Sequence, residues 1–170
     1  NVIGGGDWAS DRLIPDLVRS FTSGTPPMIR NPSFTRPWQH VLDALNGYIV
    51  LAEHLSVTPN AHSGAWNFGP EASYSPVSVE TIVKKSLAHW EMGEVSYHVQ
   101  PDQEKLEAHT LNLDSSKAEN ILNWKPVWDV HRAIEETLDW YYQRSQGIGA
   151  EELCLNQIVA FFNEKALLND

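Results

Sequence analysis

The sequence lacks several features that common classes of protein require. It contains a single cysteine, Cys154, so no disulfide can form within the chain, and we expect a protein of the reducing cytoplasm. No apolar run approaches the ~20 residues that a membrane-spanning helix needs. The sequence therefore gives no indication of a membrane span.

Positive charge is scarce and nowhere forms a run of lysines and arginines. Twelve Lys and Arg residues stand against 22 Asp and Glu residues, which gives a formal net charge of -10 at pH 7. Nucleic acids and anionic membrane surfaces attract basic proteins. We therefore expect neither of them as a partner.

Patterns of catalytic and metal-binding residues are missing as well. The seven histidines show no H-x-x-x-H or H-E-x-x-H spacing, so no metal site is expected. There is no G-x-S-x-G elbow and no P-loop. No tyrosine is followed four positions later by lysine, which is the proton-transfer pair of short-chain dehydrogenases. The chain is predicted to bind a ligand rather than to carry the reacting groups.

Arginine is the only basic residue type in the first forty positions. Four arginines and three aspartates give this segment a formal net charge of +1 within an acidic chain. Guanidinium groups match phosphate oxygens two at a time, so the segment is a candidate site for a phosphorylated small ligand. An ordinary exposed surface is the alternative. The arginines are Arg12, Arg19, Arg30 and Arg36.

Three glycines, Gly4 to Gly6, form the densest glycine segment of the chain. Together with Ala9 they satisfy the dinucleotide-binding pattern G-x-G-x-x-[G/A]. That pattern also needs an acidic residue about 20 positions later, where the chain has only Gly24 to Arg30, so we reject it. Two interpretations remain, a tight turn with positive φ or a bare backbone that a ligand approaches closely.

The seven tryptophans have two possible roles. Aromatic rings stack on sugars, which would suit a carbohydrate-binding module with exposed, coplanar indoles. Large aromatic side chains more often fill protein cores. We expect most of these tryptophans to be core residues.

Length and hydrophobic pattern predict one mixed α/β domain. The chain has 170 residues, of which 42% are hydrophobic, enough for a substantial core. It opens at Asn1 directly before the apolar pair Val2-Ile3, as at the end of a buried strand, and we interpret it as the C-terminal piece of a larger protein. Helices are predicted over 13–21 (capped by Asp11), 41–55, 79–90 (capped by Ser78), 116–122 (a Ser116/Glu119 capping box), 130–141 (capped by Asp129) and 151–168, and strands at 28–29, 65–69, 95–99 and 111–113.

Several stretches of the sequence resemble the C-terminal half of the bacterial CDP-glucose 4,6-dehydratases, which are extended short-chain dehydrogenase/reductase proteins. The resemblance spans nearly the whole chain. Two motifs, Gly-Gly-Gly-Asp-Trp and Arg-Pro-Trp-Gln-His, point to the CDP-glucose branch. The stretches are 1–8 (NVIGGGDW), 11–16 (DRLIPD), 30–32 (RNP), 36–43 (RPWQHVLD), 66–70 (WNFGP), 107–109 (EAH), 113–118 (LDSSKA), 124–126 (WKP) and 137–141 (TLDWY).

The resemblance implies roles for individual residues. Asn1 and Arg36 would contact the substrate diphosphate. The nucleobase pocket would be formed by Arg12, Leu13, Ile14 and Pro15. His109 stands near a position where related enzymes often carry arginine, and would contact phosphate or ribose. Asp43 would be a structural helix cap rather than a site residue.

The resemblance also implies an activity and an organisation. CDP-glucose would be converted to CDP-4-keto-6-deoxyglucose in deoxysugar biosynthesis, with NAD and all catalytic residues held by the part of the protein before Asn1, and the full-length enzyme would be a homo-oligomer. Residues 1–40 would be a substrate-binding segment, 41–70 would return to the nucleotide-binding sheet, 71–146 would form the substrate-binding lobe, and 147–170 the C-terminal helix. The chain by itself is therefore expected to expose apolar surface.

Three alternatives stay open. The first is another epimerase or dehydratase of the same fold, with a different nucleobase preference. The second is a non-catalytic module that binds sugar nucleotides. The third and weakest is the carbohydrate-binding module.

Overall fold

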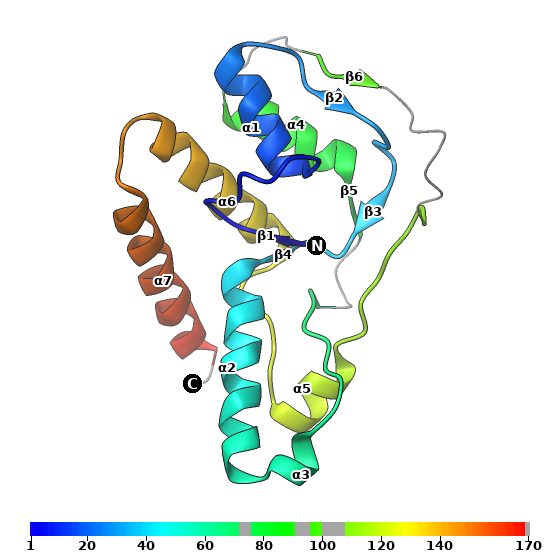
Figure 1. The fold of residues 1–170 in the computed structure, drawn as a ribbon, viewed down its shortest axis with the longest axis vertical. Coiled ribbons are helices and arrows are strands. Elements are labelled where there is room, and N and C mark those ends of the chain that lie inside the picture. The colour runs from blue at the N-terminus through cyan, green and yellow to red at the C-terminus, as the bar shows by residue number, and fades with distance from the viewer. Residues whose placement is uncertain (72–75, 91–95, 100–107, 169–170) are drawn as a thin grey trace.

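The computed structural model describes residues 1–71, 76–90, 96–99 and 108–168, which form a mixed helix and strand structure (Figure 1). The predicted α/β class is confirmed, although each strand has only two residues. The strands are β1 (Val2–Ile3), β2 (Met28–Ile29), β3 (Thr35–Arg36), β4 (Gln39–His40), β5 (Val77–Ser78) and β6 (His98–Val99). The helices are α1 (Leu13–Ser23), α2 (Val41–Val57), α3 (Pro59–His62), α4 (Val79–His89), α5 (Ser116–Leu122), α6 (Val130–Ser145) and α7 (Ala150–Leu167).

The strands form three separate two-stranded ladders. β1 pairs in parallel with β4, β2 pairs in parallel with β6, and β3 pairs antiparallel with β5. Helices α1 and α4 lie together at one end of the molecule, whereas α2, α3 and α5 form the other end (Figure 1). Helix α6 runs beside the β1–β4 ladder between these two ends.

Helix α6 forms the centre of the larger hydrophobic core. Its residues Ala133, Ile134, Leu138 and Tyr141 are buried, and burying each large apolar side chain contributes about 1.5–3 kcal/mol. The predicted cap is confirmed, because Asp129 Oδ1 accepts a hydrogen bond from the Arg132 backbone N–H at 2.7 Å. The sequence pattern thus predicted the most central helix correctly.

Of the caps predicted for three other helices, one is confirmed and two are wrong. Ser78 caps α4 as expected, since its hydroxyl accepts from the Thr81 N–H at 3.2 Å. The cap predicted for α1 is wrong, because the residue at the N-cap is Arg12 and Asp11 lies before it in a left-handed turn with φ of 60°. The capping box predicted at Ser116 is also wrong. There the N-cap is Ser115, and the carboxylate of Asp114, two positions before Ser116, accepts from the Ser116 N–H at 2.9 Å.

Two predicted strands are not formed. Residues 65–69 and 111–113 belong to no strand in the structure, although Phe68 within the first of them is buried. An apolar segment becomes a strand only where a neighbouring backbone completes its hydrogen bonds. Among the described residues, the Leu111 N–H alone has such a partner, the Thr35 carbonyl at 3.3 Å, and one bond does not make a strand. Of the strand predicted over 95–99, the structure has His98–Val99, while Val95 lies outside the described residues.

Two helices carry apolar side chains on an exposed face. Helix α2 buries Asp43, Ala44, Asn46 and Gly47, whereas an apolar stripe on the same helix contains exposed residues. The same holds for α7, which buries only Leu153 and Phe161. The exposed stripe residues are Leu45, Tyr48 and Ile49 on α2, and Leu155, Ile158, Val159 and Phe162 on α7. The expected exposure of apolar surface is therefore confirmed for these residues.

Most tryptophans are core residues, as predicted. Trp38, Trp124, Trp128 and Trp140 are buried. Trp8 is the one that is more than half exposed, at 54%, and its ring meets Tyr141 edge to face at 5.3 Å. This arrangement leaves no row of exposed indoles of the kind that a carbohydrate-binding module needs.

The glycine turn is explained by close packing rather than by its backbone alone. Gly6 has φ of 85°, which agrees with the tight-turn interpretation. A Cβ on Gly4 would lie 2.6 Å from Val41 Cγ1, and a Cβ on Gly5 would overlap the indole of Trp140. The bare backbone thus accommodates residues of α2 and α6.

Asp43 is buried in the first turn of α2, but it does not cap that helix. The side chain of His40 takes the cap position, where Nδ1 accepts from the Leu42 N–H at 3.3 Å. Asp43 instead accepts hydrogen bonds from the backbone N–H groups of Val127 (2.6 Å) and Trp128 (3.4 Å). Burial raises the pKa of Asp43 to about 6, and these two hydrogen bonds oppose the shift. The prediction of a helix cap is wrong, whereas that of a structural role agrees with these contacts.

The two buried groups Asp43 and His40 predict opposite effects of pH on the stability of the fold. Because the pKa of Asp43 is raised, its contribution to stability is present below about pH 4 and is lost as the pH rises through 6. Burial lowers the pKa of His40 to about 4, so its contribution is present above pH 6.5 and is lost as the pH falls. Each amounts to about 3 kcal/mol at ~1.4 kcal/mol per pKa unit.

Asp43→Asn should therefore have an unfolding free energy that rises relative to that of the wild type between pH 4 and 6. His40→Gln should show the reverse trend between pH 4 and 6.5. Urea unfolding of the wild type and both variants at four pH values across this range measures the differences. Parallel curves for all three proteins would contradict the assignment.

Gly5→Ala should destabilise the chain, because the buried Trp140 has no room to move away from a new methyl group. Such overpacking costs about 1–3 kcal/mol. Gly149→Ala is the matched control, since nothing lies within 4 Å of a Cβ built there. Gly149 is the N-cap of α7 with φ of -64°, so the expected cost is only that of a less favourable cap, about 1 kcal/mol or less. Equal thermal midpoints for the two variants would show that the turn does not depend on this close approach.

Candidate functional site

The β1–β4 ladder brings the start of the chain beside the Arg36 segment. The Gln39 N–H donates to the Asn1 carbonyl at 3.1 Å, and the Asn1 amino group donates to the Pro37 carbonyl at 2.9 Å. Asn1 therefore lies next to Arg36 although 35 positions separate them in the sequence. Two of the predicted phosphate-contacting residues are thus neighbours.

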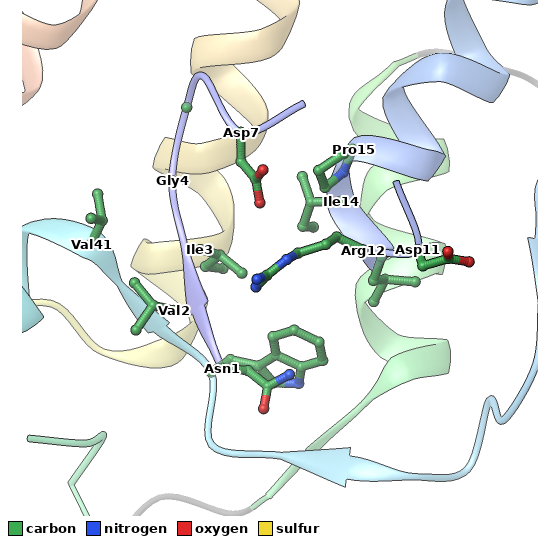
Figure 2. Close-up of a pocket in the computed structure, with 13 residues that line it drawn as sticks. Asn1, Val2, Ile3, Gly4, Asp7, Asp11, Arg12, Ile14, Pro15 and Val41 are labelled. Atoms are coloured by element: carbon green, nitrogen blue, oxygen red, sulfur yellow. The ribbon is translucent and has the colours of Figure 1, made fainter. Parts of the chain in front are cut away.

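A cavity of about 420 Å³ opens between β1, the glycine turn and the start of α1 (Figure 2). Asn1, Arg12, Leu13, Ile14 and Pro15 all line it. Helix α1 begins at Leu13, so its first turn presents these residues toward the strand. The structure brings together five of the seven residues that were predicted to bind substrate.

Arg12 is the charged group that reaches furthest into this cavity. Its side chain extends from the start of α1 toward β1, and the Asp7 carboxylate also points into the space (Figure 2). Among the described residues, none forms a hydrogen bond or an ion pair with the Arg12 guanidinium. Asp7 is held by the Ala9 N–H, which donates to its Oδ1 at 2.9 Å. The Arg12 guanidinium is therefore available to an anionic ligand.

A second cavity of about 220 Å³ lies between α1 and the chain from Pro27 to Arg36. Asn1 and Leu13 line both cavities, so the two adjoin along these residues. Phe34 and Trp38 contribute aromatic surface to the second cavity, and Arg36 contributes a charged side chain. This cavity combines an apolar wall with a cation, as a nucleotide site requires.

Arg36 is also engaged with backbone carbonyl groups. Its Nη1 donates to the carbonyl oxygens of Thr35 (2.8 Å), Ala108 (3.0 Å) and His109 (3.4 Å). The guanidinium carbon lies 5.3 Å from the centre of the Phe34 ring. These contacts fix the side chain at the rim of the second cavity, so that it is oriented before a ligand arrives.

His109 is not brought to either of the two cavities. Its ring packs against Phe34 at 5.0 Å between centroids, and its Nε2 lies 3.4 Å from the Ser33 hydroxyl. Phe34 itself lines the second cavity. The His109 side chain therefore stands behind the cavity wall rather than within it.

The arginine-rich segment has its own counter-charges. Arg19 forms an ion pair with Asp16, and Arg30 lies 3.9 Å from Asp11. The excess of positive charge predicted from the sequence is thus partly neutralised within the site.

Sequence reasoning did not single out Asp11, Asp16, Ser20 or Phe34 as site residues, although all four line the second cavity. The helical spacing contained part of the signal. Positions 13, 16, 17 and 20 fall on one face of α1, and two of them are polar. Phe34 carried no signal, because only the chain turn before β3 places it at the cavity.

The described residues show no other site of these kinds. No group of three or more His, Cys, Asp or Glu side chains among them is placed to hold a metal ion. No helix in the described part of the chain is long and apolar enough to cross a membrane.

The sequence is similar to a curated enzyme over most of its length. It is 45% identical over 141 residues to the CDP-glucose 4,6-dehydratase of Salmonella typhimurium, which covers 83% of this chain and 39% of that protein. A UDP-glucose 4-epimerase of Erwinia amylovora is 25% identical over 66% of this chain and 31% of its own length. No protein-family model matches the chain. The chain spans about two fifths or less of the length of these relatives.

Solved structures share the fold at low sequence identity. UDP-glucose 4-epimerase from Thermotoga maritima, solved with UDP-glucose, superposes with a TM-score of 0.68 at 16% identity, over 86% of this chain and 44% of that one. The dTDP-glucose 4,6-dehydratase of Bacillus anthracis, solved with NAD, gives 0.67 at 16% identity, over 86% and 43%. The chain thus has the fold of part of an extended short-chain dehydrogenase/reductase protein, and its sequence is similar to part of a CDP-glucose 4,6-dehydratase.

Proposed function

We propose that this chain is the sugar-nucleotide-binding C-terminal part of a CDP-glucose 4,6-dehydratase, a lyase that converts CDP-glucose to CDP-4-keto-6-deoxyglucose. The observation that carries the proposal is the 45% identity over 83% of the chain to the Salmonella typhimurium enzyme. In this proposal the chain binds and orients the substrate, and contributes no catalytic residue. The substrate is its small-molecule partner, and homo-oligomers and a cytoplasmic location stay predictions for the complete protein.

The two adjoining cavities suit the two ends of a nucleotide sugar. Arg36 and Asn1 lie together at the rim of the second cavity, where a diphosphate would meet a guanidinium fork and an amide. Leu13 lines both cavities and Leu17 lines the second, so a base in the second cavity would lie against these two residues of α1. The sugar would then point toward the first cavity, where Arg12 is available to a phosphate or sugar oxygen. This placement differs from the resemblance, which assigns Arg12, Ile14 and Pro15 to the nucleobase pocket and leaves only Leu13 of that set beside the base. Ile14 and Pro15 form the apolar wall of that cavity.

NAD is proposed for the complete protein and not for this chain alone. A dinucleotide fingerprint needs glycines whose backbone is open to the pyrophosphate. Gly4 and Gly5 are instead explained by close packing against Val41 and Trp140, and positions 24–30 hold no acidic residue for the ribose, so the described residues do not fit such a cradle. Bound elsewhere in the protein, NAD would supply the hydride acceptor.

A UDP-sugar epimerase of the same fold is the second candidate. The observation in its favour is the 25–28% identity to three curated UDP-glucose 4-epimerases. A non-catalytic sugar-nucleotide module is the remaining alternative. Both would use the same two cavities. Nucleobase preference separates the epimerase from the dehydratase, and the absence of any reaction would identify the module.

The proposal is tested by product formation with the complete gene product. The protein is given CDP-glucose and NAD, with dTDP-glucose and UDP-glucose in parallel, and the 4-keto-6-deoxy sugar is measured. We expect turnover of the CDP sugar. Turnover of another nucleotide sugar alone would overturn the proposed specificity, and epimerised or unchanged substrate would favour the alternatives.

Arg36→Ala in the complete protein should raise the KM for the nucleotide sugar about ten-fold or more, since a charged hydrogen-bonded contact is worth about 1.5–3 kcal/mol. Arg36→Lys is the matched control, because it keeps the charge but loses the fork, and its KM should fall between the two. An unchanged KM with a lower thermal midpoint would assign Arg36 only to the carbonyl groups of residues 108 and 109.

A further inference from the structure

One face of α1 places two polar side chains in the second cavity. Leu13, Asp16, Leu17 and Ser20 all line it, and their spacing of three and four positions puts them on the same side of the helix. At 1.5 Å per residue, the face extends about 10 Å from Leu13 to Ser20. The cavity wall therefore changes from apolar to polar along its length.

The two ends of this cavity differ in charge. At the end near the start of α1 lie Asn1, Arg36 and the Arg30–Asp11 pair. The opposite end lies beside the turn after α1, where the Thr25 N–H donates to the Ser20 carbonyl at 2.9 Å. Asp16 stands one helical turn before Ser20. A diphosphate held at the arginine end would therefore direct its base along α1 toward Asp16 and Ser20.

Asp16 is held so that one carboxylate oxygen is engaged and the other is available. Its Oδ1 pairs with Arg19, and Arg19 is fixed in turn by the carbonyl groups of Trp8 (3.0 Å) and Ala9 (3.1 Å). No described residue donates to the Asp16 Oδ2. A carboxylate can only accept hydrogen bonds and repels phosphate oxygens, so its ligand must present a donor.

We infer that Asp16 determines the nucleobase that this site accepts, by accepting a hydrogen bond from the exocyclic amine of cytosine. Uracil and thymine carry a carbonyl oxygen at the same ring position, and that oxygen would face the carboxylate without a proton between them. The inference rests on the proposed function, because it takes the second cavity to be the nucleotide site. It extends that proposal by naming a residue that favours a cytidine nucleotide.

Ser20 does not have this effect. A hydroxyl group rotates to donate or to accept, so it serves cytosine and uracil equally well. A purely structural role of Asp16, through its ion pair with Arg19, would likewise change the binding of all nucleotides alike. The CDP-to-UDP ratio is therefore the quantity that isolates base selection.

The test compares CDP, UDP and dTDP binding to the complete protein by calorimetry, with kcat/KM for the three glucose derivatives. Asp16→Asn offers both a donor and an acceptor, so the preference for CDP over UDP should fall by about ten-fold or more. Asp16→Ser, which also removes the charge, should show the same direction of change. Thermal midpoints establish that both variants are folded.

Asp11→Asn is the matched control. It removes the same charge at the arginine end, and asparagine tolerates the left-handed backbone of that position, so it should change the affinity for all three nucleotides in parallel. Ser20→Ala should weaken CDP and UDP alike.

The outcomes separate the two proposals. A CDP-to-UDP affinity ratio that stays the same in Asp16→Asn and Asp16→Ser overturns the role of Asp16, and so does a wild type without a preference for CDP. A wild type that binds CDP preferentially through Asp16 but does not dehydrate CDP-glucose supports the inference and overturns the proposed reaction.

Discussion

The buried carboxylate of Asp43 fixes the relation between the two halves of the chain. It sits at the start of α2, directly after β4, and receives the backbone N–H groups of Val127 and Trp128, which precede α6 by a few residues. A buried charged acceptor is stable only while its donors stay in place. The start of α6 is therefore held against β4, and the edge-to-face contact of His40 with Trp128 at 4.7 Å supports the same junction.

The candidate site depends on this junction through α6. Near the end of that helix, Trp140 packs on Gly5, and the Tyr141 hydroxyl donates to the Asp7 carbonyl at 2.6 Å. These two contacts shape the glycine turn, which forms one wall of the first cavity. β4 pairs with β1 and so sets the place of Asn1. A substitution at this junction would therefore change the shape of the first cavity, although the substituted residue does not line it.

The sequence predicted the parts of this structure that local physics decides. Helices α1, α4 and α6 followed from apolar periodicity, and the Ser78 and Asp129 caps from short-range hydrogen bonding. Two local predictions, the Asp11 cap of α1 and the Ser116 cap of α5, were each misplaced by one residue. The other predictions that failed depended on distant partners. Residues 65–69 lack a neighbouring strand among the described residues, and much of the apolar surface of α2 and α7 stays exposed there. Asn1, Leu13 and Arg36 were grouped by family resemblance, since no local pattern links positions so far apart. Asp16 was missed because its role depends on which face of α1 lines the cavity.

The charge balance of the site bears on selectivity as well as on affinity. Arg30 and Arg19 are paired with Asp11 and Asp16 in the unliganded chain, whereas Arg12 has no such partner among the described residues. A phosphate that binds near Arg30 must compete with Asp11 for the guanidinium. The electrostatic attraction of the site for anions in general is therefore weakened, and an anion that is poorly placed binds with little affinity. A ligand that places phosphates at the arginines and a hydrogen-bond donor at Asp16 satisfies both kinds of charge at once. Discrimination then comes from the aspartates as much as from the arginines, because a site that contains both signs penalises a wrong ligand in addition to rewarding a right one.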